Sequence, residues 1–166
     1  MRHDTSGSIC ATGSLSDFTG EMLILPQAGA GDLMGVIDEL SRLLHAHGGG
    51  PDPREFSQAV RQRESLASTA TDYGIAFPHA RMPELKRLAF ALGRSPHPIA
   101  CSPPALRPIH FVVLSAVPES DPGGYLMLIS AWARLSKDAL CLDRLQAARD
   151  AREIYALLQQ VPIRRG

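Results

Sequence analysis

The sequence has no excess of charge of either sign and no long hydrophobic run. Its 166 residues include 17 lysines and arginines against 17 aspartates and glutamates. General nucleic-acid binders need a basic face that displaces counterions from phosphates, so this balance argues against that class of function. No segment approaches the roughly 20 apolar residues that span a bilayer, and the N-terminal stretch MRHDTSGSICATGSLSDF lacks the apolar core of a signal peptide. We therefore expect a cytoplasmic protein that would need a partner for any role at a membrane.

Cysteines are few and scattered. Cys10, Cys101 and Cys141 show neither the short spacing of a zinc or redox motif nor the even number of a disulfide framework. In a reducing compartment such cysteines are free thiols. His45 and His47 are two residues apart near the end of an expected helix, where they do not share a face. The sequence therefore predicts no disulfide and no metal site.

The sequence does contain enough apolar residues for a hydrophobic core. Hydrophobic residues make up 45% of the chain. The length fits one domain by the usual range of roughly 100–200 residues per domain. We predict a single domain over residues 15–160, with a flexible N-terminal tail at 1–14 and a C-terminal tail at 161–166.

Hydrophobic periodicity predicts the order of the elements. After an expected N-cap at Asp32, apolar residues recur at helical spacing up to Leu44, and Gly48–Gly50 ends that helix. A second helix is expected to start near Pro53. Short apolar runs predict strands at 22–25, 75–77, 88–92 and 109–117, and three more helices are expected at 125–135, 140–145 and 154–158, the last capped by Asp150. This order predicts an α/β domain in which helices cover a sheet.

The periodicity breaks in residues 66–81, which we interpret as an irregular segment around a short strand. His79 follows Pro78 just beyond that strand, in a position where functional side chains are common. Neutral histidine supplies a nucleophilic nitrogen, and the guanidinium groups of Arg63 and Arg81 could bind phosphate oxygens as forks. The alternative is an ordinary surface or hydrogen-bonded histidine.

The run GIAFPHAR, preceded by RESLAST, closely resembles the phosphorylation-site signature of enzyme IIA domains. These domains, of the fructose/mannitol and nitrogen-regulatory class, belong to the bacterial phosphoenolpyruvate-dependent sugar phosphotransferase system. The segments VVLSAVPE, DPGGYLMLISAWARLSKD and AREIYALLQQ follow in the family's order, so the resemblance covers about residues 15–160. It implies a mixed β-sheet sandwiched between α-helices.

The resemblance also implies a function and its residues. His79 matches the phosphoacceptor, which takes phosphate from a histidine phosphocarrier protein and passes it to a IIB transport module. Arg63 matches an arginine that stabilises the phosphate, and Ser68 and Thr69 match a hydroxyl pair facing the site. Such a phosphotransferase component needs no metal and no organic cofactor. The alternative is a nitrogen-type regulatory module whose phosphorylation state controls its binding to protein partners.

Tyr125 is the main departure from the family pattern, because many members carry a second histidine at this place. A phenol can hydrogen-bond a phosphate but does not become a cation near neutral pH. Tyr125 could instead pack its ring between helix and sheet. His110, in the strand expected at 109–117, is a candidate to replace the missing histidine in space, with a hydrogen-bonded structural histidine as the alternative.

Overall fold

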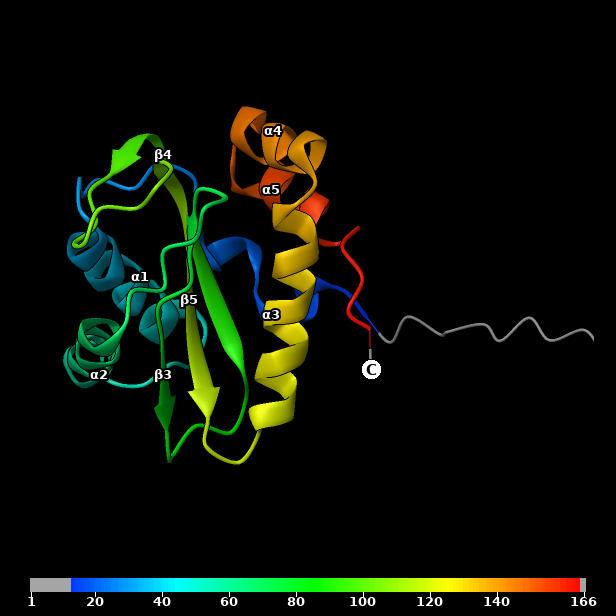
Figure 1. Ribbon diagram of the computed structural model, residues 1–166. Coiled ribbons are helices and arrows are strands. Elements are labelled where there is room, and N and C mark those ends of the chain that lie inside the picture. Colours follow the sequence, from blue (N-terminus) through cyan, green and yellow to red (C-terminus); the bar gives the residue numbers. More distant parts are fainter. Residues whose placement is uncertain (1–12, 165–166) are drawn as a thin grey trace, which may run out of the picture.

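A five-stranded mixed sheet lies between two layers of helices in the computed structural model, which describes residues 13–164 (Figure 1). The strands are β1 (Ile24–Leu25), β2 (Ile75–Ala76), β3 (His79–Met82), β4 (Ala89–Ile99) and β5 (Ile109–Pro118). The α-helices are α1 (Leu33–His47), α2 (Pro53–Leu66), α3 (Pro122–Ser136), α4 (Ala139–Ala147) and α5 (Ala151–Leu158). Short 3-10 helices at Leu15–Phe18 and Glu21–Leu23 precede β1. The predicted fold class, a mixed sheet sandwiched between α-helices, is confirmed.

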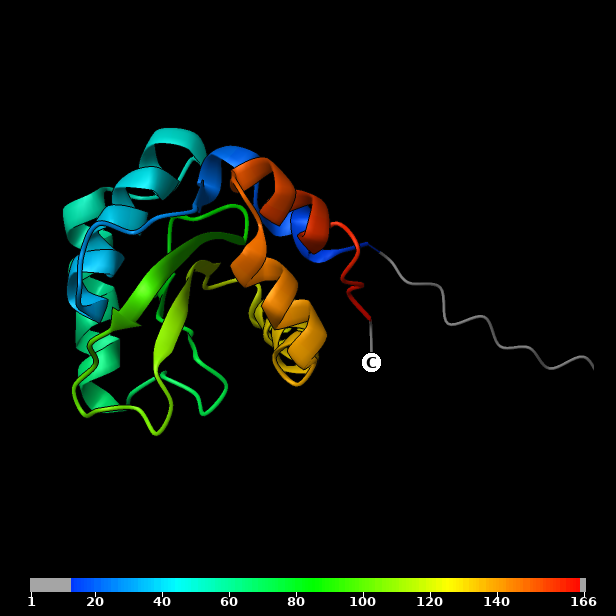
Figure 2. The same cartoon turned by 90° about the horizontal axis from the view of Figure 1, so that it is seen from above.

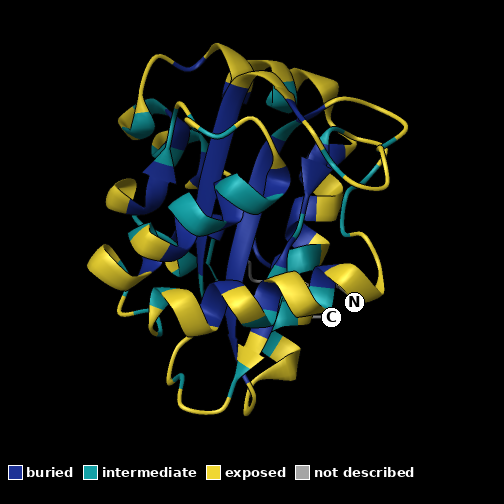
Figure 3. Cartoon of the chain, turned by 90° about the vertical axis from the view of Figure 1, so that its left-hand side faces the viewer, coloured by how far each residue is buried: buried dark blue, intermediate teal, exposed yellow. Residues whose placement is uncertain are grey.

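Each face of the sheet carries its own hydrophobic core. α1 and α2 cover one face, and α3, with α4 and α5 near one end, covers the other (Figures 1 and 2). The first core includes Leu40 and Val112, and the second includes Val113 and Trp132. β5 therefore has buried side chains on both of its faces, as its long apolar run predicts. Figure 3 shows the strands buried and the outer sides of the helices exposed.

An aspartate caps the N-terminus of each α-helix in residues 13–164. The caps are Asp32, Asp52, Asp121, Asp138 and Asp150, and each side chain accepts a hydrogen bond from a backbone N–H of the first turn. The caps predicted at Asp32 and Asp150 are confirmed. α3 begins at Pro122, before the predicted start at Tyr125, because Asp121 accepts from Gly124 N at 2.9 Å and proline suits a first turn.

β2 and β3 are two halves of one strand that runs parallel to β5. They pair with residues 111–112 and 115–118 of β5, and the register is unchanged across the break between them. The break falls at Phe77 and Pro78, because proline has no N–H to donate to the ladder. The prediction of an irregular segment up to residue 81 is therefore wrong in its last part, since the strand resumes at His79.

β4 is longer than its apolar run predicts. Residues 88–92 predict a short strand followed by a proline-rich loop around His97, whereas β4 continues to Ile99. Its pairing with β5 is irregular between Arg94 and Ile99, and proline is tolerated in a strand where ladder hydrogen bonds are missing. His97 is exposed in this stretch.

The two ends of the described chain meet beside η1, at Leu15–Phe18. Ser14 forms a β-bridge with Pro162, and the backbone N–H of Ile163 donates to the carbonyl of Gly13 at 3.0 Å. Ile163 is only 2% exposed. The packed chain therefore extends slightly past the boundaries predicted at 15 and 160, because apolar residues of the expected C-terminal tail enter the core. Most of the expected N-terminal tail lies outside the described residues.

Candidate active site

His79 is the first residue of β3, and the strand break fixes its orientation. Side chains alternate along a strand, and Phe77, on the same side as His79, packs in the core on the α3 face. The Nδ1 atom of His79 lies 3.0 Å from the carbonyl oxygen of Phe77. Because a carbonyl oxygen only accepts, Nδ1 carries the proton and donates it. The lone pair of the imidazole is therefore on Nε2.

Tyr125, in the first turn of α3, covers the imidazole of His79. The two ring centroids are 4.8 Å apart, with a tilt of 36° between the ring planes. Burial raises the pKa of the Tyr125 phenol to about 12, although the positive charges of Arg63 and Arg81 act to lower it. The phenol is therefore protonated at neutral pH, so that its hydroxyl is available as a hydrogen-bond donor.

Burial and charge keep His79 neutral. Burial is the largest cause that lowers the pKa of His79 below its usual value, and the hydrogen bond to the Phe77 carbonyl acts in the opposite direction. The charges of Arg63 and Arg81 lower this pKa further, whereas Glu64 raises it. The net direction is downward, so at neutral pH the imidazole is an uncharged base with a free nitrogen lone pair.

The two arginines approach the site from different elements. Arg63 is half-buried in the last turn of α2, and its Nη1 donates to the carbonyl of Ala67 at 3.2 Å. Arg81 is exposed on β3, two residues beyond His79 and therefore on the same side of the strand. Neither guanidinium forms an ion pair within residues 13–164. Both charges remain available to an anion that reaches His79.

Glu64 is a residue of the site that sequence reasoning missed. It is 7% exposed, and its carboxylate accepts two hydrogen bonds from Thr69: the backbone N–H at 2.8 Å and the hydroxyl at 2.7 Å. This carboxylate holds the loop after α2 in place, next to the two arginines. The signal was present in the sequence, because Phe56, Val60 and Glu64 follow one another at helical spacing on the buried face of α2.

Ser68 and Thr69, which the resemblance implies as a hydroxyl pair facing the site, form hydrogen bonds to Glu64 and within the loop that follows α2. The Thr69 hydroxyl is committed to Glu64, and the Ser68 hydroxyl accepts from the backbone N–H of Ala70 at 3.2 Å. The backbone of Thr69 lies beside the strand, since its carbonyl accepts from Phe77 N at 3.2 Å. Both hydroxyls thus shape the loop beside His79, and no hydrogen bond joins either of them to the imidazole.

His110 does not replace the missing second histidine. Its Nδ1 lies 3.0 Å from the carbonyl oxygen of Ser95, so it is a hydrogen-bonded structural histidine. On β5 it is five positions away from Ser115, the partner of His79, a rise of roughly 17 Å.

The described residues offer no other reactive centre of comparable kind. Within residues 13–164, no three histidine, cysteine, aspartate or glutamate side chains are grouped to hold a metal ion. Cys101 and Cys141 are free thiols, and burial raises the pKa of each. No helix in this part of the chain has the length and apolar character needed to cross a membrane. The site at His79 thus offers a neutral imidazole nitrogen that feels the positive charges of Arg63 and Arg81.

Comparison with protein families gives a match over nearly the whole described chain. The family described as "Phosphoenolpyruvate-dependent sugar phosphotransferase system, EIIA 2" matches residues 18–161. A nitrogen regulatory protein of Bradyrhizobium diazoefficiens is 30% identical over 148 residues, which cover 89% of this chain and 96% of that protein. The fructose-specific EIIABC component of Bacillus subtilis is 32% identical over 100 residues, but these cover 60% of this chain and only 16% of that longer protein.

Solved structures show the same fold. The nitrogen regulatory protein IIA-Ntr of Neisseria meningitidis superimposes with a TM-score of 0.71 at 21% identity, over 87% of this chain and 98% of that one. The mannitol IIA of Escherichia coli gives a TM-score of 0.70 at 20% identity, over 84% and 97% of the two chains. The match to residues 18–161 and the 30% identity to the Bradyrhizobium protein show that the chain belongs to the EIIA type 2 family of the phosphoenolpyruvate-dependent sugar phosphotransferase system.

Proposed function

We propose that this chain is a phosphoryl carrier in which Nε2 of His79 accepts a phosphoryl group from a histidine phosphocarrier protein. The observation that supports this most directly is the hydrogen bond from Nδ1 to the Phe77 carbonyl, because it leaves Nε2 as the nucleophile. Arg63 and Arg81 supply positive charge beside that nitrogen. Family membership makes phosphoryl transfer the reaction that this arrangement serves.

The transfer step needs no group beyond the two proteins. The Nε2 lone pair of His79 forms the new N–P bond as the N–P bond of the donor breaks, and the bonding pair returns to the donor's imidazole. The proton on Nδ1 of His79 stays in its hydrogen bond. Catalysis then depends on positioning and on stabilising the charge spread over the phosphoryl oxygens. Arg63 and Arg81 serve that second purpose.

Tyr125 would contribute from the other side of the imidazole. Its protonated hydroxyl can donate a hydrogen bond to a phosphoryl oxygen without adding positive charge. Because Tyr125 lies in the first turn of α3, the positive end of that helix dipole is also near His79. Many family members have a second histidine here, which can be cationic. This site has a neutral hydrogen-bond donor and the N-terminus of a helix in its place.

The phosphorylated chain either passes its phosphoryl group to a IIB transport module or, as a regulatory module, controls its binding to protein partners by its phosphorylation state. The transport reading rests on relatives such as the fructose-specific component, and on a solved complex of the mannitol IIA with phosphorylated IIB. The regulatory reading rests on the Bradyrhizobium relative, which matches this chain over 96% of its own length. We also propose a cytoplasmic location, the compartment in which free thiols such as Cys101 and Cys141 persist.

Phosphorylation followed by intact-mass measurement tests this function. The chain is incubated with phosphoenolpyruvate, the first enzyme of the relay and the phosphocarrier. We expect one added phosphoryl group that is lost in acid, as a phosphoramidate is. His79→Ala should lose the label while its circular dichroism stays that of the parent; undiminished labelling of a folded His79→Ala would refute the proposal. A IIB module is then added to the labelled chain. In the transport function the phosphoryl group passes to the IIB module, whereas in the regulatory function it stays on His79.

A further inference from the structure

A second site of a different character lies between α1 and α2. It is a groove of about 630 Å³, a volume within the range of roughly 300–1,000 Å³ of small-molecule sites. It is lined by Asp38, Arg42, Asp52, Pro53, Arg54, Ser57, Gln58 and Arg61. None of the side chains described above around His79 is among them. All of its lining residues except Pro53 carry a polar or charged group.

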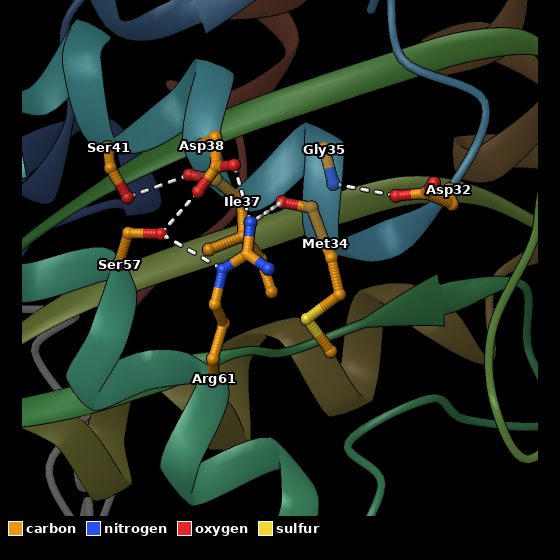
Figure 4. Close-up of polar contacts among 8 residues, drawn as sticks. All are labelled: Asp32, Met34, Gly35, Ile37, Asp38, Ser41, Ser57 and Arg61. Atoms are coloured by element: carbon orange, nitrogen blue, oxygen red, sulfur yellow. Dashed lines mark hydrogen bonds and ion pairs between the residues drawn. The ribbon is translucent and has the colours of Figure 1, made fainter. Parts of the chain in front are cut away.

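The helical spacing of these residues builds the two walls of the groove. Asp38 and Arg42 are one turn apart on α1, and Arg54, Gln58 and Arg61 follow one another at spacings of four and three on α2. The short connection 48–52 makes α1 and α2 neighbours that run in opposite directions. The two rows therefore face each other, as Figure 4 shows for Asp38 and Arg61.

One end of the groove is held rigid by a polar network (Figure 4). Arg61 Nη2 lies 2.5 Å from Asp38 Oδ2 and donates to the carbonyl of Met34 at 3.3 Å. Arg61 Nε donates to the Ser57 hydroxyl at 3.3 Å, and that hydroxyl donates to Asp38 Oδ1. The charge of Arg61 is thus neutralised by Asp38, and its side chain is fixed before any ligand arrives.

The other end of the groove carries positive charge that the protein does not use. Within residues 13–164, the guanidinium groups of Arg42 and Arg54 take part in no ion pair, and neither donates a hydrogen bond. The carboxylate of Asp52 caps α2, where Oδ1 accepts from the backbone N–H groups of Arg54 and Glu55 at 3.0 and 3.1 Å. The groove therefore has three guanidinium groups against two carboxylates, in a protein whose formal net charge is zero.

We propose that this groove binds a small, hydroxyl-bearing phosphate monoester. Guanidinium groups match phosphate oxygens as forks, so Arg42 and Arg54 would hold the phosphate. The amide of Gln58 and the second oxygen of Asp52 offer a donor and acceptors for the hydroxyl groups of the ligand. The inference is independent of phosphorylation at His79, because it rests on other residues and another part of the fold.

Calorimetric titration of the full chain with glucose 6-phosphate tests this inference, with glucose, succinate and inorganic phosphate as comparison ligands. We expect glucose 6-phosphate to bind more tightly than the other three. Arg42→Gln and Arg54→Gln should each weaken its binding roughly tenfold or more, the effect of losing a charge-assisted hydrogen bond. Arg152→Gln on α5, an exposed arginine outside the groove, is the matched control and should bind like the parent.

Amide chemical shifts locate the bound ligand, since the arginines near His79 could also attract phosphate. We expect glucose 6-phosphate to change the amide shifts of residues in α1 and α2. The same changes should occur in Arg63→Gln. Absence of binding, equal affinity for succinate or inorganic phosphate, or a loss of binding in Arg63→Gln but not in Arg42→Gln would each overturn the inference. Arg42→Gln should still be phosphorylated at His79, so a failure here leaves the phosphoryl-carrier function intact.

Discussion

Because the ring of Tyr125 lies against the imidazole of His79, substitutions of Tyr125 can separate the role of its hydroxyl from that of its ring. Tyr125→Phe keeps the ring contact at 4.8 Å and removes only the hydroxyl, so the free energy of unfolding should change by less than about 1 kcal/mol. If the hydroxyl donates to a phosphoryl oxygen, this variant should accept phosphate roughly tenfold more slowly, as expected for one lost hydrogen bond to a charged group. Rapid-quench labelling by the phosphocarrier measures the rate.

Tyr125→His completes the comparison. It introduces a group that titrates near pH 6.5, so its transfer rate should gain a dependence on pH around neutrality that the parent lacks. Equal rates for the parent and Tyr125→Phe would show that Tyr125 acts only through ring packing, with the arginines as the sole stabilisers of the phosphate.

The lowered pKa of His79 links its protonation to stability. The unfolded chain binds a proton at His79 near pH 6.5, whereas the folded chain binds it only at lower pH. Below about pH 6.5 the unfolded state therefore holds more protons, and stability falls as pH falls, down to the folded pKa. Urea unfolding at pH 7.5 and 5.5 should show a smaller loss of stability for His79→Gln than for the parent; equal losses would contradict the shift.

At the scale of elements, Arg94 connects the sheet to the C-terminal helices. It is 8% exposed, although it carries a charge. Its guanidinium donates to the carbonyls of Leu145 at 2.8 Å and Ala148 at 2.6 Å, at the end of α4, and to that of Pro26 at 3.0 Å beyond β1. The carbonyls of Leu145 and Ala148 lie at the end of α4, where a cation is favourable at the negative end of the helix dipole.

Arg94→Met should therefore destabilise the protein strongly. The methionine retains apolar bulk but leaves buried carbonyl groups without donors, at a cost of roughly 2–5 kcal/mol in the free energy of unfolding. Urea denaturation followed by circular dichroism measures this loss. Arg152→Met on α5, an exposed arginine, is the control and should change stability by less than about 0.5 kcal/mol. A loss in Arg94→Met no larger than in the control would show that the carbonyls find other partners.

At the scale of the whole molecule, β5 belongs to both hydrophobic cores. Val112 and Leu114 face α1 and α2, whereas Val113 packs with Trp132 on the α3 face. Neither layer of helices can leave the sheet without exposing one face of this strand. We therefore expect residues 13–164 to unfold in one cooperative transition.

Two optical probes test this cooperativity. Trp132 is the only tryptophan, and it is fully buried beside Phe90, with ring centroids 5.7 Å apart. Its fluorescence reports on the α3 face alone, whereas far-ultraviolet circular dichroism reports on all helices. The two urea midpoints should coincide. Separate midpoints would show that the helical layers unfold independently.

Much of this structure follows from local sequence. Helical spacing and aspartate caps place the helices, because both signals act within one or two turns of the same segment. The run GIAFPHAR predicts that a short strand ends before Pro78 and that His79 lies just beyond it, since the effect of Pro78 on its neighbours is also local. Arg63 and Tyr125 were expected near His79 from the resemblance, and Arg81 from its place two residues along the chain. The Tyr125 ring lies against the imidazole, and the charges of both arginines act on the pKa of His79.

The remaining features depend on residues that are distant in the sequence. The strand that resumes at His79 exists because β5 pairs with it, and β4 extends past its prolines for the same reason. Local signals could not show that His110 bonds to Ser95 or that Arg94 reaches α4. The sequence by itself determined the helices, the apolar central strand and the position of His79 beside Pro78. Tertiary structure decided the partners of the buried polar groups, because a buried donor or acceptor takes whichever partner the packed elements bring within reach.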